Sequence, residues 1–181
     1  PRSTPLYSSA ASDVYKRQIL TISLILILSS LMSAQAQLAK KGKYSGTCSY
    51  SGKVLSMHMQ GKAPAMILAE FYGSCLNDAG SGIWHRNSFK CDYSIEVMKM
   101  PNTQGNGYCT FRDADGDTMT FRASTTGSLG GPSDAKTKVT NGTGKYKGMT
   151  GTGWYRSNPV PAFEQGTFQG MTKFGGSYQI P

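Results

Sequence analysis

Four polar side chains in the first half of the chain carry groups that can bind a ligand or move a proton: Glu70, Tyr72, His85 and Asn87. They fall in two runs, 66–75 and 83–90, on either side of the turn-forming residues 77–82. A symmetric hairpin places Glu70 opposite Phe89, and all four polar side chains then share one face. A carboxylate and an imidazole that converge inside a barrel can exchange a proton. The alternative is a solvent-facing set, because a slip of one residue sends every side chain to the other side.

Three aspartates in the sequence Asp113-x-Asp115-Gly-Asp117 are candidates for binding calcium. An EF-hand loop needs glycine at position six and a bidentate glutamate at position twelve. Counted from Asp113, glycine stands at the fourth position and Ser124 at the twelfth. A three-residue hairpin loop that ends in glycine accounts for Gly116 instead. The sequence therefore predicts a turn here and no metal site.

The residues on either side of this loop alternate between apolar and polar types. In the register that the loop sets, Phe111 lies opposite Met119, and Cys109 lies opposite Phe121. The other face of the hairpin is polar and carries Thr110, Arg112, Thr118 and Thr120. One buried apolar face and one solvent-exposed polar face are typical of an antiparallel sheet that covers a core.

The chain has four cysteines, and their even number suggests two disulfides in an oxidising compartment. No C-x-x-C pair occurs, so their spacing does not predict a zinc site. A further hairpin across Pro101 places Cys91 opposite Cys109, which leaves Cys48 to pair with Cys75. Four cysteines allow three pairings, and this one is the pairing that the hairpin favours.

The N-terminal part of the chain has the layout of an export signal. A run without charges, 19–31, is followed by the A-x-A site Ala34-Gln-Ala36. We therefore expect a signal peptide over 19–36, a secreted or periplasmic protein, and a single domain over 37–181 with no membrane span. Residues 1–18 resemble translated adaptor sequence and are expected to be a non-native tail.

The charge and the motifs of the 37–181 domain limit the classes of partner and cofactor that we expect for it. Basic residues exceed acidic ones by nine in the whole chain. They stand singly or in pairs, with no basic block interleaved with aromatics, so we do not expect nucleic-acid binding. No G-x-S-x-G motif, P-loop or dinucleotide fingerprint occurs, and the sequence therefore indicates no cofactor and no recognisable catalytic motif. The oligomeric state is left open.

Glycine distribution predicts the fold class. All 22 glycines fall between Gly42 and Gly176, and between them lie short runs of strand-forming residues. No run keeps a helical period, so the pattern predicts an antiparallel sandwich or barrel. Glycines inside a strand mark bends and close approaches, such as the corners of a small barrel. The densest glycine pattern lies over 139–155, with candidate structural glycines Gly142, Gly144, Gly148 and Gly151.

This segment resembles the G-G-T-G-x-[FY]-x-G-x-x-G motif of the allene oxide cyclase and dirigent barrel-like superfamily. Tyr146 fills the aromatic position, and Asn141 stands where the motif has its first glycine. The chain is similar, over residues 42–181, to small exported bacterial proteins of this type that have no assigned activity. The resemblance implies an all-β fold, a closed or nearly closed antiparallel barrel of about eight strands, and no particular reaction.

Three functions are consistent with such a barrel. The first is a binding module for a small, largely apolar ligand, which requires an apolar cavity. The second is an isomerase or cyclase, which requires Glu70 and His85 to meet inside the lumen. The third is an envelope-associated structural protein with a filled barrel and a basic exterior. We favour the binding module, because no catalytic constellation is recognisable.

Overall fold

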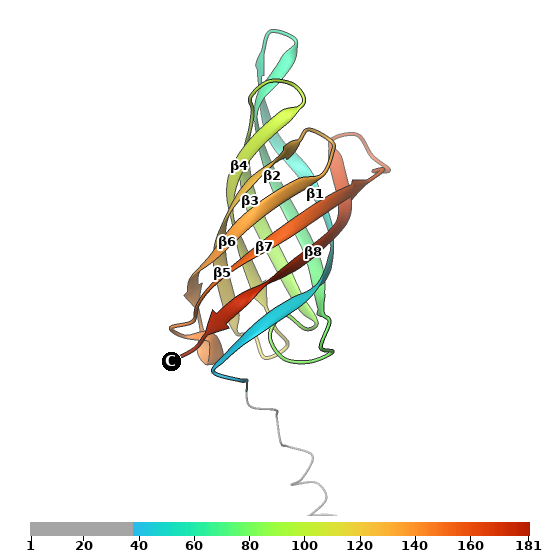
Figure 1. The fold of residues 1–181 in the computed structure, drawn as a ribbon. Coiled ribbons are helices and arrows are strands. Elements are labelled where there is room, and N and C mark those ends of the chain that lie inside the picture. Colours follow the sequence, from blue (N-terminus) through green and yellow to red (C-terminus); the bar gives the residue numbers. More distant parts are fainter. Residues whose placement is uncertain (1–37) are drawn as a thin grey trace, which may run out of the picture. The chain divides into compact units, whose positions relative to one another are not determined.

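The computed structural model describes residues 38–181, which form a closed antiparallel barrel (Figure 1). Each strand pairs with the next along the chain, and pairing of β1 with β8 closes the barrel. In this range the elements are β1 (Lys41–Gln60), β2 (Ala63–Asn77), β3 (Asn87–Val97), β4 (Asn102–Arg112), β5 (Thr118–Ser128), β6 (Ser133–Gly142), η1 (Gly144–Tyr146), β7 (Thr150–Val160) and β8 (Thr167–Gln179). The predicted tail and signal peptide lie outside the described residues.

The two ends of the barrel differ in how they are built. The plugged end carries the β2–β3, β4–β5 and β6–β7 connections together with Leu38 and Pro181. The rim carries the β1–β2, β3–β4, β5–β6 and β7–β8 connections, and the β1–β2 hairpin projects farthest there (Figure 1). Residues 38–181 contain the eight strands described here, both disulfides and the core cluster, and they form one compact unit with its own core.

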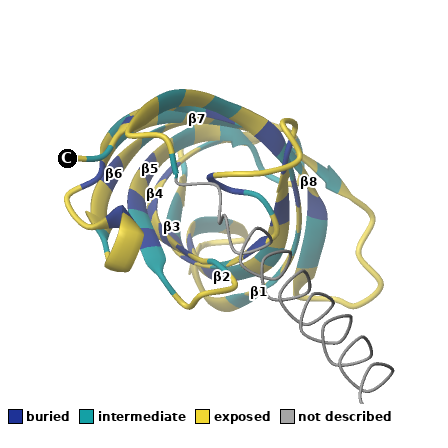
Figure 2. Cartoon of the chain, turned by 90° about the horizontal axis from the view of Figure 1, so that it is seen from below, coloured by how far each residue is buried: buried dark blue, intermediate teal, exposed yellow. Residues whose placement is uncertain are grey.

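Alternation along each strand produces a lumen face and an outer face. In β4 and β5 the odd-numbered residues are the more buried set and the even-numbered residues are mostly exposed. Seen along the barrel axis, buried and exposed segments alternate along the strands (Figure 2). The core therefore lies inside the barrel, as expected when each strand has one apolar face.

Two of the predicted hairpins are confirmed. In β4–β5, Phe111 pairs with Met119 and Cys109 with Phe121, and Gly116 has a φ of +88°. In β3–β4, Cys91 pairs with Cys109, and these two residues form a disulfide. The second disulfide joins Cys48 to its cross-strand partner Cys75. The predicted pairing of the four cysteines is thus the one in the structure.

The predicted β2–β3 register is wrong. Glu70 pairs with Asp92, and the residue opposite Phe89 is Gly73. The connection is longer than the symmetric hairpin assumes, because residues 78–86 form an irregular loop before β3 begins at Asn87. The observed register differs from the predicted one by an odd number of residues. Glu70 and Asn87, which the prediction put on one face, therefore lie on opposite faces of the sheet.

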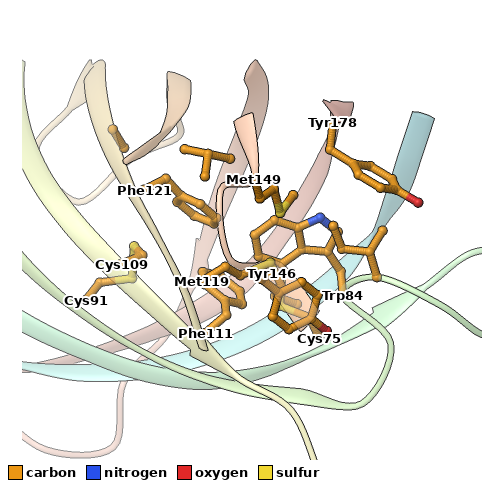
Figure 3. Close-up of a cluster of buried hydrophobic side chains, with 14 of the residues drawn as sticks. Cys75, Trp84, Cys91, Cys109, Phe111, Met119, Phe121, Tyr146, Met149 and Tyr178 are labelled. Carbon is orange, nitrogen blue, oxygen red and sulfur yellow. A yellow bond between two sulfur atoms is a disulfide. The ribbon is translucent and has the colours of Figure 1, made fainter. Parts of the chain in front are cut away.

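The β2–β3 loop closes the plugged end with Trp84. This side chain is 2% exposed, and its ring centroid lies 4.5 Å from that of Phe111 and 4.8 Å from that of Phe121. Figure 3 shows it among the buried side chains of this end, including Tyr146 and Met149. Trp84 has a φ of +69°, a left-handed conformation that a bulky residue adopts only when its surroundings impose it.

Glycines opposite aromatic residues let the rings lie flat against the wall. A Cβ on Gly73 would come within 2.6 Å of the Phe89 ring, and one on Gly107 within 2.5 Å of the Tyr93 ring. The same relation holds for three further pairs, Gly46 with Phe174, Gly52 with Phe168 and Gly170 with Tyr50. Glycine supplies the space that these rings need, which is why the strands contain so many of them.

The four predicted structural glycines lie between β6 and the start of β7. Gly142 ends β6, and Gly144 opens η1 with a φ of +50°. Gly148 has a φ of +75°, and Gly151 lies in β7 so close to β8 that a Cβ would meet the Ser177 carbonyl oxygen at 2.5 Å. Positive φ at two positions and close strand contact at a third explain the need for glycine.

Candidate ligand-binding cavity

The barrel encloses a cavity of about 170 Å³. It extends from Trp84 at the plugged end to Gly131 and Ser133 in and beside the β5–β6 connection at the rim. An engineered apolar protein cavity of about 150 Å³ holds one benzene molecule. The cavity in this barrel therefore has room for a ligand the size of one aromatic ring.

The lining has an apolar side and a hydroxyl-bearing side. Strands β2 to β5 contribute four phenylalanine rings: Phe71, Phe89, Phe111 and Phe121. The lining serines and threonines all come from β6, β7 and β8: Ser133, Thr137, Ser157 and Thr172. Strand β8 also adds Phe168 and Phe174. A ligand with an apolar body and one polar group matches this division.

Four tyrosines place hydroxyl groups in the lumen. The Tyr93 and Tyr155 hydroxyl oxygens are 3.1 Å apart, and the Ser157 hydroxyl donates to the Tyr50 oxygen at 2.9 Å. Burial raises the pKa of Tyr44 to about 12, and burial also raises the pKa of Tyr93. These phenols are therefore neutral hydrogen-bonding groups at physiological pH.

No Asp, Glu, Lys, Arg or His is among the residues of the 38–181 range that line the cavity. An ion that entered would lose its hydration without meeting an opposite charge, at a cost of several kcal/mol. The lining therefore favours a neutral ligand. At the floor, the buried Trp84 Nε1–H has no hydrogen-bond partner within the described part of the chain.

Glu70 and Tyr72, two of the predicted site residues, lie on the outer wall. The Lys90 Nζ is 2.8 Å from one Glu70 carboxylate oxygen, and the Lys53 Nζ is 3.3 Å from the other. Hydrogen bonds from Lys90 and then from Tyr72 lower the pKa of Glu70 to about 2. Tyr72 is 44% exposed, with the Lys90 Nζ 5.6 Å from its ring centroid.

The other two predicted residues lie at the plugged end. His85 is in the β2–β3 loop, where its backbone N–H donates to the Gly82 carbonyl at 3.3 Å. Asn87 is 1% exposed and pairs with Cys75 on the lumen side, and its side-chain nitrogen has no hydrogen-bond partner among the described residues. The structure does not bring Glu70 and His85 together, so the acid–base pair of the isomerase hypothesis does not form.

The aspartate-rich loop is occupied by a lysine. The Lys145 Nζ contacts Asp113 at 2.7 Å and also contacts Asp115, while the Lys145 backbone N–H donates to Asp117 at 3.0 Å. The side chain thus stands where a bound cation would compensate the carboxylates. Among residues 38–181, no group of three or more His, Cys, Asp or Glu side chains is arranged to hold a metal ion.

The prediction missed the residues that line the cavity, although one signal could have found them. Cross-strand disulfide partners share a face, and side chains in a strand alternate with a period of two. Cys48 therefore marks Tyr44 and Tyr50 as lumen residues, and Cys91 marks Phe89 and Tyr93. Trp84 had no such signal, because it lies in an irregular loop.

Fold and site together define a small, disulfide-bonded, closed β-barrel with an aromatic-lined internal cavity. No protein-family model matches the chain, and no curated protein matches it. Among solved structures, the pterocarpan synthase dirigent protein GePTS1 is similar, with 9% identity, a TM-score of 0.47, and coverage of 80% of this chain and 90% of that one. The pterocarpan synthase dirigent protein PsPTS1 is also similar, with 11% identity, a TM-score of 0.40, and coverage of 80% of this chain and 97% of that one.

Proposed function

We propose that this protein binds a small, neutral, largely apolar ligand of single-ring size inside its barrel. The observation that carries the proposal is the cavity of about 170 Å³ between a phenylalanine wall and a hydroxyl-bearing wall. Phenylalanine rings favour an apolar body by removing it from water. Seryl, threonyl and tyrosyl hydroxyls orient one polar substituent, and a ligand acceptor would satisfy the Trp84 N–H.

Export of the protein is part of this proposal. The apolar run 19–31 and the A-x-A site support a secretory signal. The disulfides Cys48–Cys75 and Cys91–Cys109 suit an oxidising compartment outside the cytoplasm. N-terminal sequencing of protein recovered outside the cytoplasm checks this part, since cleavage after Ala36 leaves Gln37 first. An N-terminus that retains residues 19–36 would contradict it.

The binding proposal is tested by calorimetric titration of residues 38–181 with phenol, anisole and benzoate. Phenol and anisole are neutral and of single-ring size, and we expect dissociation constants on the order of 0.1–1 mM. Benzoate has a similar shape but carries a charge that the lining cannot compensate, so we expect no measurable binding. Equal affinity for benzoate and phenol, or no binding of either neutral probe, would overturn the proposal.

A matched pair of variants locates the binding site. Ser157→Phe adds a ring inside the cavity and should weaken phenol binding at least about tenfold, because the probe and the new ring compete for one volume. Asn158→Phe adds the same ring to the exposed face of β7 and should leave phenol binding unchanged. Urea unfolding confirms that both variants are folded. Equal binding by both folded variants would place the ligand outside the lumen.

A further inference from the structure

The rim carries a group of exposed apolar side chains that the binding proposal does not use. Phe163 in the β7–β8 connection is 97% exposed, and Met98 in the β3–β4 connection is 62% exposed. We use the term apolar rim for the exposed side chains Leu55, Met57, Met59, Met66, Met98, Met100, Val160 and Phe163. Exposed apolar groups gathered at one end of a molecule mark an interaction site.

Backbone hydrogen bonds connect the parts of this apolar rim. The Leu129 N–H donates to the Pro101 carbonyl at 2.7 Å, which joins the β5–β6 and β3–β4 connections. The Val54 N–H donates to the Gly166 carbonyl at 2.9 Å, which joins β1 to the β7–β8 connection. These bonds tie the connections that carry Met98, Met100 and Phe163 to neighbouring parts of the barrel.

Charge at the apolar rim indicates the kind of partner. Lys62 stands at the tip of the β1–β2 hairpin, and Lys99 lies between Met98 and Met100. Glu164 is the only acidic residue in the four rim connections, and two further acids lie at the adjoining strand ends. Glu96 accepts a hydrogen bond from the Gln104 side chain, and Asp134 pairs with Arg156. Apolar side chains beside lysines match a bilayer surface with anionic headgroups. The apolar side chains enter the interface, and the lysines pair with the lipid phosphates.

The shape of this end also favours a bilayer over a protein face. The hairpins that carry these exposed residues are of unequal length, and the β1–β2 hairpin extends beyond the others (Figure 1). A soft lipid interface accommodates projections of unequal height, whereas a stable protein partner requires a closely complementary surface. Methionine, with its flexible and polarizable side chain, suits contact with such an irregular environment.

We propose that the apolar rim docks this protein on membranes that contain anionic lipids. The cavity reaches the same end at Gly131 and Ser133, so docking would hold it toward the apolar phase. Docking itself rests on the apolar rim and its lysines, and it does not require the cavity to hold a ligand. Failure of phenol binding and failure of docking are therefore separate results.

Co-sedimentation with vesicles tests this proposal. Residues 38–181 are used, since the apolar run 19–31 would itself bind lipid. We expect binding to phosphatidylcholine vesicles that contain phosphatidylglycerol, and weaker binding to pure phosphatidylcholine. The double variant Met98→Ser/Phe163→Ser should lower the partition coefficient about tenfold or more, because each large side chain contributes substantial apolar area. Leu76→Ser, which removes an apolar side chain nearly as exposed as Met98 but located at the plugged end, should bind like the unmodified chain.

The lysine contribution has its own variant. Lys62→Gln/Lys99→Gln should bind anionic vesicles several-fold more weakly and lose most of the difference between the two vesicle types. No vesicle binding by the unmodified chain would overturn the proposal. So would an equal loss in Leu76→Ser, or unchanged binding by Met98→Ser/Phe163→Ser. A dimer in sedimentation velocity that this double variant dissociates would assign the apolar rim to a second copy instead, and would also overturn it.

Discussion

At the scale of single residues, Glu70 shows how neighbours decide the chemistry of a carboxylate. Its ion pairs with Lys90 and Lys53 and its hydrogen bond with Tyr72 hold it ionised on the outer wall, with a pKa of about 2. A group whose pKa is lowered by folding stabilises the fold above its unfolded pKa, and this contribution is lost as the pH falls toward about 2. Glu70 is therefore a wall residue and not a proton donor at neutral pH.

Removal of Lys90 tests this assignment. Lys90→Met should raise the pKa of Glu70 from about 2 toward the ordinary glutamate value, because its strongest hydrogen-bond donor is lost. The stabilisation that this group contributes at neutral pH then becomes smaller, and its loss on acidification is complete at a higher pH. Carboxyl-carbon NMR titration measures the shift, and Lys136→Met on the outer face of β6 serves as the control. An ordinary Glu70 pKa in the unmodified chain would contradict the ion-pair geometry.

At the scale of strands, the pairing of aromatic residues with glycines sets how the wall is built. Five of the lumen rings lie against a glycine on the neighbouring strand, as Phe89 lies against Gly73. A ring that lies flat buries its area without filling the centre of the barrel, so the cavity remains open. The same pairing holds each strand in register, because a slip would bring a side chain under the ring.

Gly73→Ala tests the importance of this pairing. The added methyl group would clash with the Ser49 carbonyl oxygen and lie 2.6 Å from the Phe89 ring, and we expect a loss of about 3 kcal/mol in the free energy of unfolding. Urea unfolding measures it. Gly131→Ala is the matched control, since its nearest neighbour is the Ser128 side chain at 3.1 Å and its φ is not left-handed. Equal losses in both variants would show that the Gly73–Phe89 contact is not the cause.

At the scale of the whole molecule, one irregular loop decides that the barrel is closed at one end and hollow above it. Trp84 fills the plugged end and forms the floor of the cavity, while its backbone adopts a left-handed φ of +69°. Packing against Phe111, Phe121 and Tyr44 holds this conformation in place. Trp84 therefore contributes both to the stability of the barrel and to the shape of the cavity.

Replacement of Trp84 should lower both the free energy of unfolding and the affinity for phenol. Trp84→Ala should cost roughly 3–5 kcal/mol of unfolding free energy, because a large buried ring leaves a void. It should also weaken phenol binding, since the cavity loses its floor. Trp154→Ala removes a ring that is 51% exposed and should cost about 1 kcal/mol or less. Thermal unfolding with and without phenol measures these effects, and equal destabilisation by both variants would contradict the assigned role of Trp84.

Local patterns in the sequence determined much of the architecture. The turn at Gly116 and the alternation around it predicted the β4–β5 pairing, and the hairpin across Pro101 predicted the disulfide between Cys91 and Cys109. These features could be predicted because short connections impose the register of the strands that they join. Glycine spacing likewise predicted an antiparallel sandwich or barrel, and the superfamily resemblance implied a barrel of about eight strands.

The tertiary structure alone decided where the site lies. Residues 78–86 form a loop too long to impose a hairpin register, so we attribute the β2–β3 register to the packing of Trp84 against Phe111 and Phe121. That packing puts Glu70 outside and Asn87 inside, which the symmetric hairpin could not predict. Closure of β1 on β8 likewise joins the two ends of the barrel sequence and creates the cavity. A period of two indicates which residues share a face, but only long-range packing determines which face encloses the lumen.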